Sequence, residues 1–177
     1  MQLVDNLKLL IRDVHDFPRP GIVFKDITPL LETPQIVNKV VKALASQSKG
    51  TKVDAVVAIE ARGFLFGFLL AYELGVPFVP VRKEGKLPYR KITQAYTLEY
   101  GTAAIEMHED AIKPGWKVVI HDDLLATGGT ANAAGQLVER LGGEVAGFSF
   151  IVNLDFLGGF ALLRKQFNQE PRYLINY

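Results

Sequence analysis

Cysteine is absent from the 177-residue chain, so neither disulfide bonds nor thiolate metal sites can form. An excess of one charge is also lacking, because 20 basic and 19 acidic residues leave a formal net charge of +1. This balance argues against a strongly basic nucleic-acid-binding protein. The longest apolar run, residues 63–72, is far shorter than the roughly 20 residues of a membrane-spanning helix. We therefore expect a cytoplasmic protein that binds neither nucleic acid nor a membrane.

The apolar patterns that are present predict a single α/β domain over residues 1–177. Hydrophobic residues make up 49% of the chain, an ordinary proportion for a globular protein, which argues against disorder. Apolar periodicity predicts strands at residues 53–59, 78–81, 117–120, 145–152 and 173–175, and helices at 3–14, 34–44, 63–72 and 134–141, with a further short helix near the end. Strands that alternate with helices indicate a mostly parallel central sheet flanked by helices, with ligands bound beyond the carboxyl ends of the strands.

The strongest chemical signal is the segment VVIHDDLLATGGT, residues 118–130. An apolar strand leads into Asp122 and Asp123, and a Thr-Gly-Gly-Thr turn then opens a helix. The glycines let backbone N–H groups surround an anion, and the threonine hydroxyls add donors, so the turn suits a phosphate. The carboxylates would repel a phosphate but can accept hydrogen bonds from vicinal hydroxyls. The segment predicts a ribose 5-phosphate site, whereas a plain strand–turn–helix connection would give the two acids no role.

This segment resembles the phosphoribosyl pyrophosphate motif of the type I phosphoribosyltransferases. His121 departs from the family pattern, which usually has an aliphatic residue there, and a lone histidine at a strand end is more often structural than catalytic. The resemblance implies the type I phosphoribosyltransferase fold, with a small N-terminal hood and a mobile catalytic loop. It assigns seven residues to the sugar phosphate: Asp122, Asp123, Ala126, Thr127, Gly128, Gly129 and Thr130.

Further segments resemble the adenine phosphoribosyltransferase family in particular. The stretch FPRPGIVFKDITPLL is similar to that family's purine-binding hood, which we place within residues 1–35. Phe24 offers a flat apolar face on which a base can stack, and the resemblance implies that the main chain of Val23 and Lys25 reads the edge of the base. Leu154 matches a position that lines the base pocket. Core packing is the alternative for both Phe24 and Leu154.

Two cationic segments are candidates for binding pyrophosphate. The resemblance implies that Arg62, which follows the strand at residues 53–59, is a phosphate ligand. Its planar guanidinium suits phosphate oxygens, with a surface ion pair as the alternative. Arg82, Lys83 and Lys86 place three cations within five residues. Most such runs are solvated faces, but this one follows a buried strand and opens a long excursion. The resemblance implies that some of these cations act across a homodimer interface.

Residues 82–105 are predicted to be a flexible loop region, because residues 82–100 are charged and show little periodicity. Long irregular segments in compact domains are usually functional or disordered. The sequence LEYG at residues 98–101 resembles the mobile catalytic loop of the family. The resemblance implies that Glu99 is the general acid/base at the imidazole nitrogen of the purine and that Tyr100 contacts substrate. Considered alone, Glu99 would be an exposed strand residue.

The resemblance implies transfer of the 5-phosphoribosyl group from phosphoribosyl pyrophosphate to adenine, which gives AMP and pyrophosphate. Mg²⁺ is the expected cofactor; the sequence assigns it no direct ligand, and it would arrive on phosphoribosyl pyrophosphate near Asp122. Three alternatives remain open: a phosphoribosyltransferase for another base such as xanthine, a regulator that has lost catalysis, and a nucleotide-binding domain without chemistry. A regulator would be expected to have a DNA-binding segment or a broad basic surface, and neither is evident.

Overall fold

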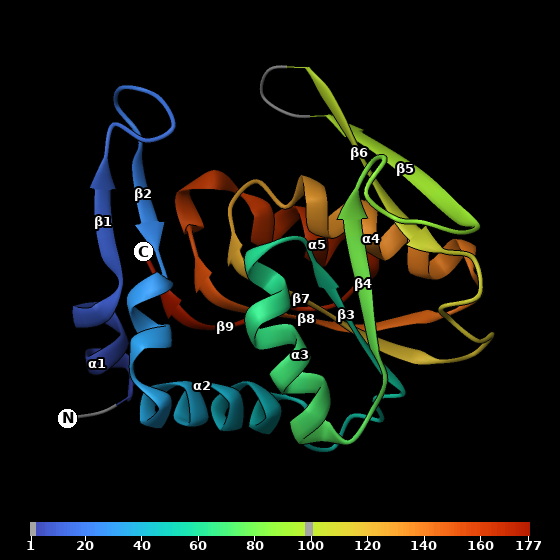
Figure 1. Cartoon of the computed structure of the whole chain (residues 1–177), viewed down its shortest axis with the longest axis horizontal. Coiled ribbons are helices and arrows are strands. Elements are labelled where there is room, and N and C mark those ends of the chain that lie inside the picture. Colours follow the sequence, from blue (N-terminus) through green and yellow to red (C-terminus); the bar gives the residue numbers. More distant parts are fainter. Residues whose placement is uncertain (1–2, 98–100) are drawn as a thin grey trace.

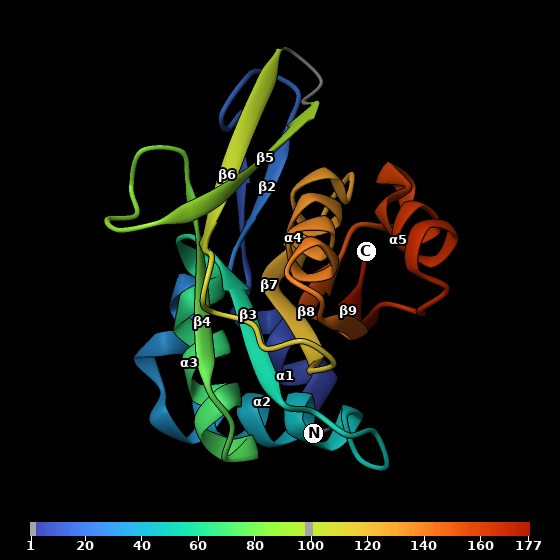
Figure 2. The ribbon, with the colours of Figure 1, turned by 90° about the vertical axis from the view of Figure 1, so that its right-hand side faces the viewer.

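A computed structural model describes residues 3–97 and 101–177, and shows a twisted central sheet with helices on both faces (Figures 1 and 2). The strands are β1 Arg12–His15, β2 Val23–Asp26, β3 Ala55–Ile59, β4 Phe78–Lys83, β5 Lys91–Thr97, β6 Thr102–His108, β7 Lys117–Leu125, β8 Glu144–Asn153 and β9 Arg172–Asn176. The helices are α1 Leu3–Leu10, α2 Pro34–Gln47, α3 Arg62–Leu74, α4 Gly129–Arg140 and α5 Gly159–Phe167, with short 3₁₀ helices η1 Thr28–Glu32 and η2 Asp155–Leu157. None of the helices in the described ranges could cross a bilayer.

The main sheet has seven strands in the order β5-β6-β4-β3-β7-β8-β9 within the described residues. The five strands from β4 to β9 run parallel, and β6 and β5 extend the sheet in antiparallel pairing. Every residue of β3 is buried, as expected of a strand covered on both faces. Val57 packs in the cluster formed with α4 and α5, whereas Val56 packs in the cluster formed with α1, α2 and α3. The predicted α/β class and mostly parallel sheet are confirmed.

In the sequence, Thr33 before Pro34 indicates a helix start and Gly75 indicates a helix stop, and the structure confirms both boundaries. Thr33 is the N-cap of α2 and Pro34 its first residue, although the Thr33 side chain makes no capping hydrogen bond. Gly75 ends α3 in the left-handed conformation, with φ at 67°, where a side chain would be strained. Both signals are read from neighbouring residues alone, which explains why the sequence was sufficient.

The prediction of a helix over residues 3–14 was wrong at its end. Helix α1 stops at Leu10, and β1 pairs in antiparallel fashion with β2 to form a separate hairpin, the hood hairpin, residues 12–26. Its turn contains a cis Phe17-Pro18 peptide, and the Gly21 N–H donates to Asp16 Oδ1 at 2.7 Å. The apolar residue Val14 fits a helical stripe equally well, and only the pairing partner across the turn decides for a strand.

The irregular excursion predicted at residues 82–100 was wrong in part. Residues 91–97 and 102–108 pair as β5 and β6 into a second hairpin, and we call these two strands the arm; of the described residues between β4 and β5, residues 84–90 form an irregular turn. Strand β5 is exposed at every second residue, so it has few apolar residues to mark it in the sequence. Figures 1 and 2 show the arm and the hood hairpin projecting past the end of the sheet at which β3 and β7 terminate.

Candidate functional site

The two adjacent acids lie in the second half of β7, which continues past the predicted residues 117–120 to Leu125. Successive strand side chains point to opposite faces, so Asp122 and Asp123 meet different neighbours. Asp122 lines a hollow of about 490 Å³ together with Thr130. The Asp123 side chain is only 4% exposed, and its Oδ2 lies 2.9 Å from Arg62 Nε. The sequence predicted the acids as one unit, and the structure gives them separate surroundings.

Burial sets the electrostatics of this acid pair, Asp122 and Asp123. Desolvation raises the pKa of Asp122 well above its ordinary value, and the neighbouring Asp123 charge raises it further. Desolvation also raises the pKa of Asp123, although the Arg62 guanidinium opposes the shift. The Asp123 N–H donates to Asp122 Oδ1 at 2.9 Å. A pair in this environment favours partners that bring hydroxyl donors or positive charge to the carboxylates.

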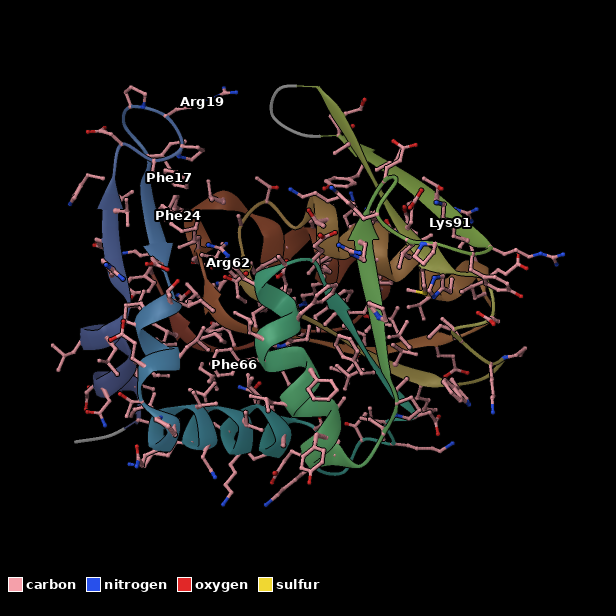
Figure 3. All side chains as sticks on the ribbon, in the orientation of Figure 1. Phe17, Arg19, Phe24, Arg62, Phe66 and Lys91 are labelled. Carbon is pink, nitrogen blue, oxygen red and sulfur yellow. The ribbon has the colours of Figure 1, made fainter. Side chains whose placement is uncertain are left out.

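Arg62, the first residue of α3, connects the acid pair to the hood hairpin. Its guanidinium carbon lies 4.5 Å from the centre of the Phe24 ring, and Phe17 packs edge-on against Phe24 at 5.2 Å (Figure 3). Because the carboxylate that it contacts is buried, Arg62 is not part of an ordinary surface ion pair. The structure thus brings Arg62, Phe24 and Asp123 together from three separate elements.

The turn between β7 and α4 forms a small hollow of about 80 Å³ that we call the cradle, residues 126–130. Gly128 has φ at 80°, in the left-handed region, and Gly129 begins α4. The N–H groups in the first turn of α4 have no acceptor within the helix, and the helix dipole adds favourable potential for an anion. The cradle therefore has the local geometry that the sequence predicted for a phosphate.

Gly159 is a residue of this site that the sequence analysis missed. It is the first residue of α5, and its N–H donates to the Ala126 carbonyl at 3.1 Å. A Cβ on Gly159 would overlap the Ala126 carbonyl oxygen and lie 2.8 Å from the Gly128 nitrogen. Gly159 thus supports the cradle from behind. The Gly-Gly pair at residues 158–159 was the available signal.

The cationic segment borders the same hollow as Asp122. Arg82 donates to both carboxylate oxygens of Glu60, at 2.9 and 3.3 Å, and to the Lys86 carbonyl at 2.9 Å. The Lys83 N–H also donates to Glu60, at 3.0 Å, and the Arg82 hydrogen bond lowers the pKa of Glu60. The side chains of Lys83 and Lys86 are exposed. The 490 Å³ hollow is lined by Ile59, Glu60, Val81, Lys83, Glu84, Tyr96, Ala103, Ala104, Ile105, Asp122 and Thr130.

The predicted base-pocket residues Val23, Lys25 and Leu154 are not among the residues that line this hollow. The peptide between Glu60 and Ala61 at the end of β3 is cis. Lys25 Nζ lies 2.6 Å from Asp13 Oδ1 and 4.0 Å from the centre of the Tyr177 ring, whereas Val23 is exposed. Leu154 is buried, and its N–H donates to the Leu125 carbonyl at 2.9 Å. Leu154 therefore lies beside the end of β7.

The predicted catalytic residue Glu99 and its neighbour Tyr100 lie outside the described residues. The end of β5 that precedes them reaches the cradle, since a Cβ on Gly129 would lie 3.4 Å from the Thr97 carbonyl oxygen. No cluster of three or more histidine or acidic residues suited to a metal occurs in residues 3–97 and 101–177. Mg²⁺ usually binds one or two carboxylates and otherwise phosphate oxygens and water. Asp122 beside the hollow fits an ion of that kind.

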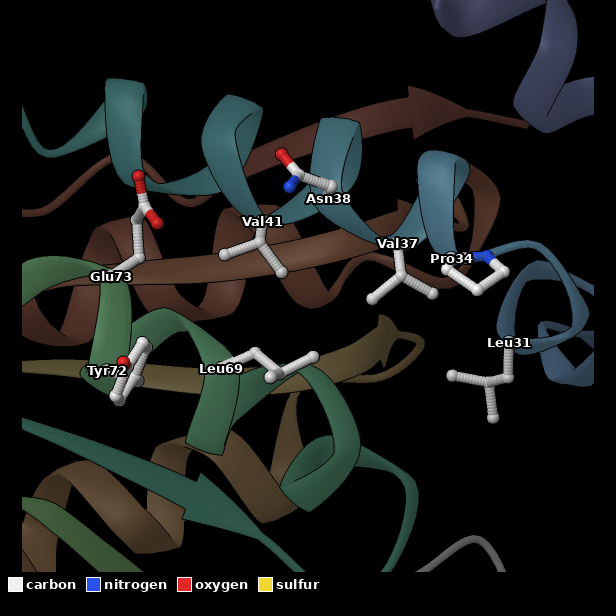
Figure 4. A pocket seen from close by; sticks show the side chains of 8 residues that line it. All are labelled: Leu31, Pro34, Val37, Asn38, Val41, Leu69, Tyr72 and Glu73. Carbon is white, nitrogen blue, oxygen red and sulfur yellow. The ribbon is translucent and has the colours of Figure 1, made fainter.

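A second hollow, of about 460 Å³, lies between α2 and α3 (Figure 4). Its polar side chains are Asn38, Glu73 and the Tyr72 hydroxyl, and it has no cation among its lining residues. The lining is otherwise apolar: Leu31, Pro34, Val37, Val41 and Leu69. Without a cation or a set of backbone donors, this hollow does not suit a phosphate.

Comparison with known proteins adds to this geometry. Residues 26–154 match the model of the phosphoribosyl transferase domain family. The chain is 57% identical over 160 residues to an adenine phosphoribosyltransferase of Sorangium cellulosum, covering 90% of this chain and 80% of that protein. The crystal structure of adenine phosphoribosyltransferase from Thermoanaerobacter pseudethanolicus superposes with a TM-score of 0.93 at 49% identity, covering 98% and 99% of the two chains. The Saccharomyces cerevisiae enzyme, solved with an imino-altritol bisphosphate and adenine, has a TM-score of 0.90 at 41% identity, covering 98% of both chains.

Proposed function

This chain belongs to the phosphoribosyl transferase domain family, among the adenine phosphoribosyltransferases, and we propose the following roles for its residues in the reaction. The enzyme transfers the 5-phosphoribosyl group from phosphoribosyl pyrophosphate to adenine, and AMP and pyrophosphate are the products. A purine nitrogen forms the new bond to the anomeric carbon while the bond to the pyrophosphate oxygen breaks. The residues must therefore hold the sugar, stabilise the leaving group and place the base.

The sugar 5-phosphate binds in the cradle, and the acid pair accepts hydrogen bonds from the ribose hydroxyls. The observation that supports this most directly is the cradle itself: a left-handed Gly128 followed by the first turn of α4, a few residues after the half-buried Asp122 and the buried Asp123. Thr127, Gly129 and Thr130 supply donors, and Ala126 contributes the backbone that α5 supports. A rigidly held sugar lowers the entropic part of the barrier.

The pyrophosphate leaves toward the cationic side of the 490 Å³ hollow. The negative charge of the pyrophosphate is offset by Arg62, Lys83 and Lys86. Arg82 contributes positive charge to the same side while it is paired with Glu60. Mg²⁺, when bound, neutralises charge on the phosphate oxygens, and Asp122 is the residue that would face it. The exposed side chains of Lys83 and Lys86 are free to contact a diphosphate without breaking a buried contact.

The base stacks near Phe24, where Arg62 already contacts the ring, and the main chain of Val23 and Lys25 reads its edge. Leu154 lines the far side of the pocket. Glu99 exchanges the proton at the imidazole nitrogen, and Tyr100 contacts the substrate when the loop closes and excludes water.

We further propose that the enzyme is a cytoplasmic homodimer. Leu65, Phe68 and Tyr72 lie at helical spacing on α3, and all three side chains are exposed. Large patches of exposed apolar surface mark interaction sites, and three exposed apolar side chains at helical spacing on one helix favour a partner there. Helix α3 also begins at Arg62, so a partner on this face would lie close to the cationic part of the site.

The experiment that tests the activity is incubation with adenine, phosphoribosyl pyrophosphate and Mg²⁺, with AMP measured by anion-exchange chromatography. Hypoxanthine, guanine and xanthine are assayed in parallel, and we expect adenine to give at least a tenfold higher kcat/KM. A higher kcat/KM for xanthine would show that the enzyme is a phosphoribosyltransferase for xanthine and not for adenine. Binding of ribose 5-phosphate without formation of any nucleotide would replace the enzymatic function with a binding function.

A further inference from the structure

Glu106 on β6 is a buried carboxylate that has no role in the scheme above. It is 3% exposed and lies opposite Arg82 of β4 on one side and Thr93 of β5 on the other. A buried carboxylate is costly unless it is paired and hydrogen-bonded. Glu106 Oε2 accepts a hydrogen bond from the Gly85 N–H at 3.1 Å and lies 3.4 Å from Lys91 Nζ. Gly85 lies in the turn at residues 84–90, and Lys91 is the first residue of β5, directly after that turn.

Further contacts hold the turn at residues 84–90 against the arm. Lys91 Nζ donates to the Leu87 carbonyl at 2.8 Å, and the Leu87 side chain is buried. The Glu84 N–H donates to the Ala104 carbonyl of β6 at 3.0 Å. Gly85 has φ at 79°, which allows the chain to reverse at the point where Glu106 holds it.

The opposite side of the turn is held by Glu60. Arg82 bridges the Glu60 carboxylate and the Lys86 carbonyl, and the Lys83 N–H donates to the same carboxylate. The turn is therefore fixed between two carboxylates through its backbone. The side chains of Lys83 and Lys86 take no part in these contacts and remain exposed.

We propose that Glu106 is a positioning residue for pyrophosphate recognition, which it serves by holding the turn at residues 84–90 so that Lys83 and Lys86 face a diphosphate. The proposal rests on the function proposed above, in which these lysines contact the pyrophosphate. Glu106 itself touches no substrate. Holding the turn in its binding shape before the ligand arrives lowers the ordering cost of binding, so losing that hold weakens diphosphate binding and leaves the base site unaffected.

Two variants test the proposal. Glu106→Gln keeps the volume and an acceptor for Gly85 but loses the charge opposite Lys91, and Lys91→Met loses the donor to both Glu106 and Leu87. Glu109→Gln is the matched control, because Glu109 is an exposed acid just after β6 whose carboxylate pairs with the exposed Arg90 at the far end of the turn, at 3.5 Å, and not with Gly85 or Lys91 in the described residues. Steady-state kinetics give the KM for pyrophosphate in the reverse reaction and for adenine in the forward reaction.

We expect Glu106→Gln and Lys91→Met to raise the KM for pyrophosphate at least fivefold, with the KM for adenine changed less than twofold. Glu109→Gln should leave both constants as in the wild type. An unchanged KM for pyrophosphate in either folded variant, or an equal rise for adenine, would overturn the proposal. Near-UV circular dichroism identifies a variant that misfolds. If one of the two variants misfolds, the KM values of the other variant test the proposal. Absence of AMP formation by the wild type would instead refute the proposed function.

Discussion

At the residue scale, the adjacent residues Asp122 and Asp123 have different surroundings in the folded protein. Asp122 faces the hollow, whereas Asp123 pairs with Arg62, and burial raises the pKa of both. Asp123 therefore has a structural partner that Asp122 lacks. A substitution at position 123 should affect both folding stability and binding, whereas one at position 122 should affect mainly binding.

Replacing the acids by amides tests their role in binding the sugar. We expect Asp122→Asn and Asp123→Asn to raise the KM for phosphoribosyl pyrophosphate at least tenfold, about 1.4 kcal/mol of binding free energy, because an amide is a weaker acceptor for hydroxyls. Asp110→Asn, in an exposed turn, is the control. Kinetics identical to the wild type in both variants would remove the acids from the site.

Glu99→Gln tests the assigned proton transfer. The amide keeps the shape of the side chain but cannot exchange a proton, so turnover should fall by about 10²–10⁴-fold. The KM for phosphoribosyl pyrophosphate should stay within about threefold of the wild-type value, because Glu99 is assigned no contact with the sugar phosphate. Pre-steady-state measurement of AMP formation separates the chemical step from product release. Equal losses in turnover and sugar-phosphate binding would contradict the assignment.

His121 contributes a pH dependence to folding stability. It is fully buried, its Nδ1 lies 3.4 Å from Ser149 Oγ, and desolvation lowers its pKa from 6.5 to about 3. The unfolded chain therefore binds a proton below pH 6.5 that the folded protein does not bind, and stability falls as the pH falls from 6.5 toward 3. We therefore expect the imidazole to be neutral in the folded protein, and the structural role of His121 that the sequence favours stays a prediction.

The size of this effect can be measured in His121→Val. From pH 7 to pH 5, His121 should cost the wild type about 2 kcal/mol of unfolding free energy, and the variant should not lose this amount. Urea unfolding at both pH values measures the difference in unfolding free energy between the wild type and the variant. The contributions of Asp122 and Asp123 cancel in this difference, because both proteins contain them. A difference that stays constant with pH would show that His121 is not held neutral.

At the scale of elements, the cradle depends on a helix that is remote in sequence. The N-terminus of α5 lies against Ala126 and Gly128, and Gly159 allows this contact because it has no side chain. The geometry of the turn is thus set from two sides, by β7 and α4 along the chain and by α5 from behind.

Gly159→Ala should therefore damage phosphate binding. The added methyl overlaps a backbone carbonyl, which cannot move without shifting the cradle, so we expect a loss of about 1–3 kcal/mol of stability and at least a tenfold rise in the KM for phosphoribosyl pyrophosphate. Gly147→Ala on β8 is the control, because a Cβ there meets no atom within 4 Å and its φ is not positive. Thermal unfolding and steady-state kinetics measure the two effects. Wild-type kinetics in Gly159→Ala would show that α5 does not shape the cradle.

The exposed apolar face of α3 matters at the scale of the whole molecule. Tyr72 is 80% exposed and Phe68 is 57% exposed, whereas Phe66, Leu70 and Ala71 of the same helix are buried in the core. We expect Tyr72→Glu to shift the protein from dimer to monomer in sedimentation velocity, because a carboxylate on this face would be desolvated in the interface. Leu9→Glu, a similarly exposed position on α1, should leave the association state unchanged. A monomeric wild type, or a dimeric Tyr72→Glu, would contradict this interface.

The sequence by itself determined the order of the central elements and the residues that make up the cradle. The strand, the acids and the Thr-Gly-Gly-Thr turn are contiguous, so the positive φ at Gly128 and the start of α4 follow from local backbone preferences, whereas the position of Ala126 also depends on α5. The stop at Gly75 and the start at Pro34 are local in the same sense. The resemblance to phosphoribosyltransferases rested on such contiguous motifs, and the family comparison confirms it.

Only the tertiary structure decided the contacts between distant segments. The stacking of Arg62 on Phe24, the pairing of Arg62 with Asp123, and the support of Ala126 by Gly159 each join residues far apart in the chain. The strands at residues 12–15 and 91–97 were likewise decided by their partners, because half-exposed strands lack a marked apolar pattern of their own. Local preferences constrain each segment separately, whereas the order and packing of the strands determine which side chains meet.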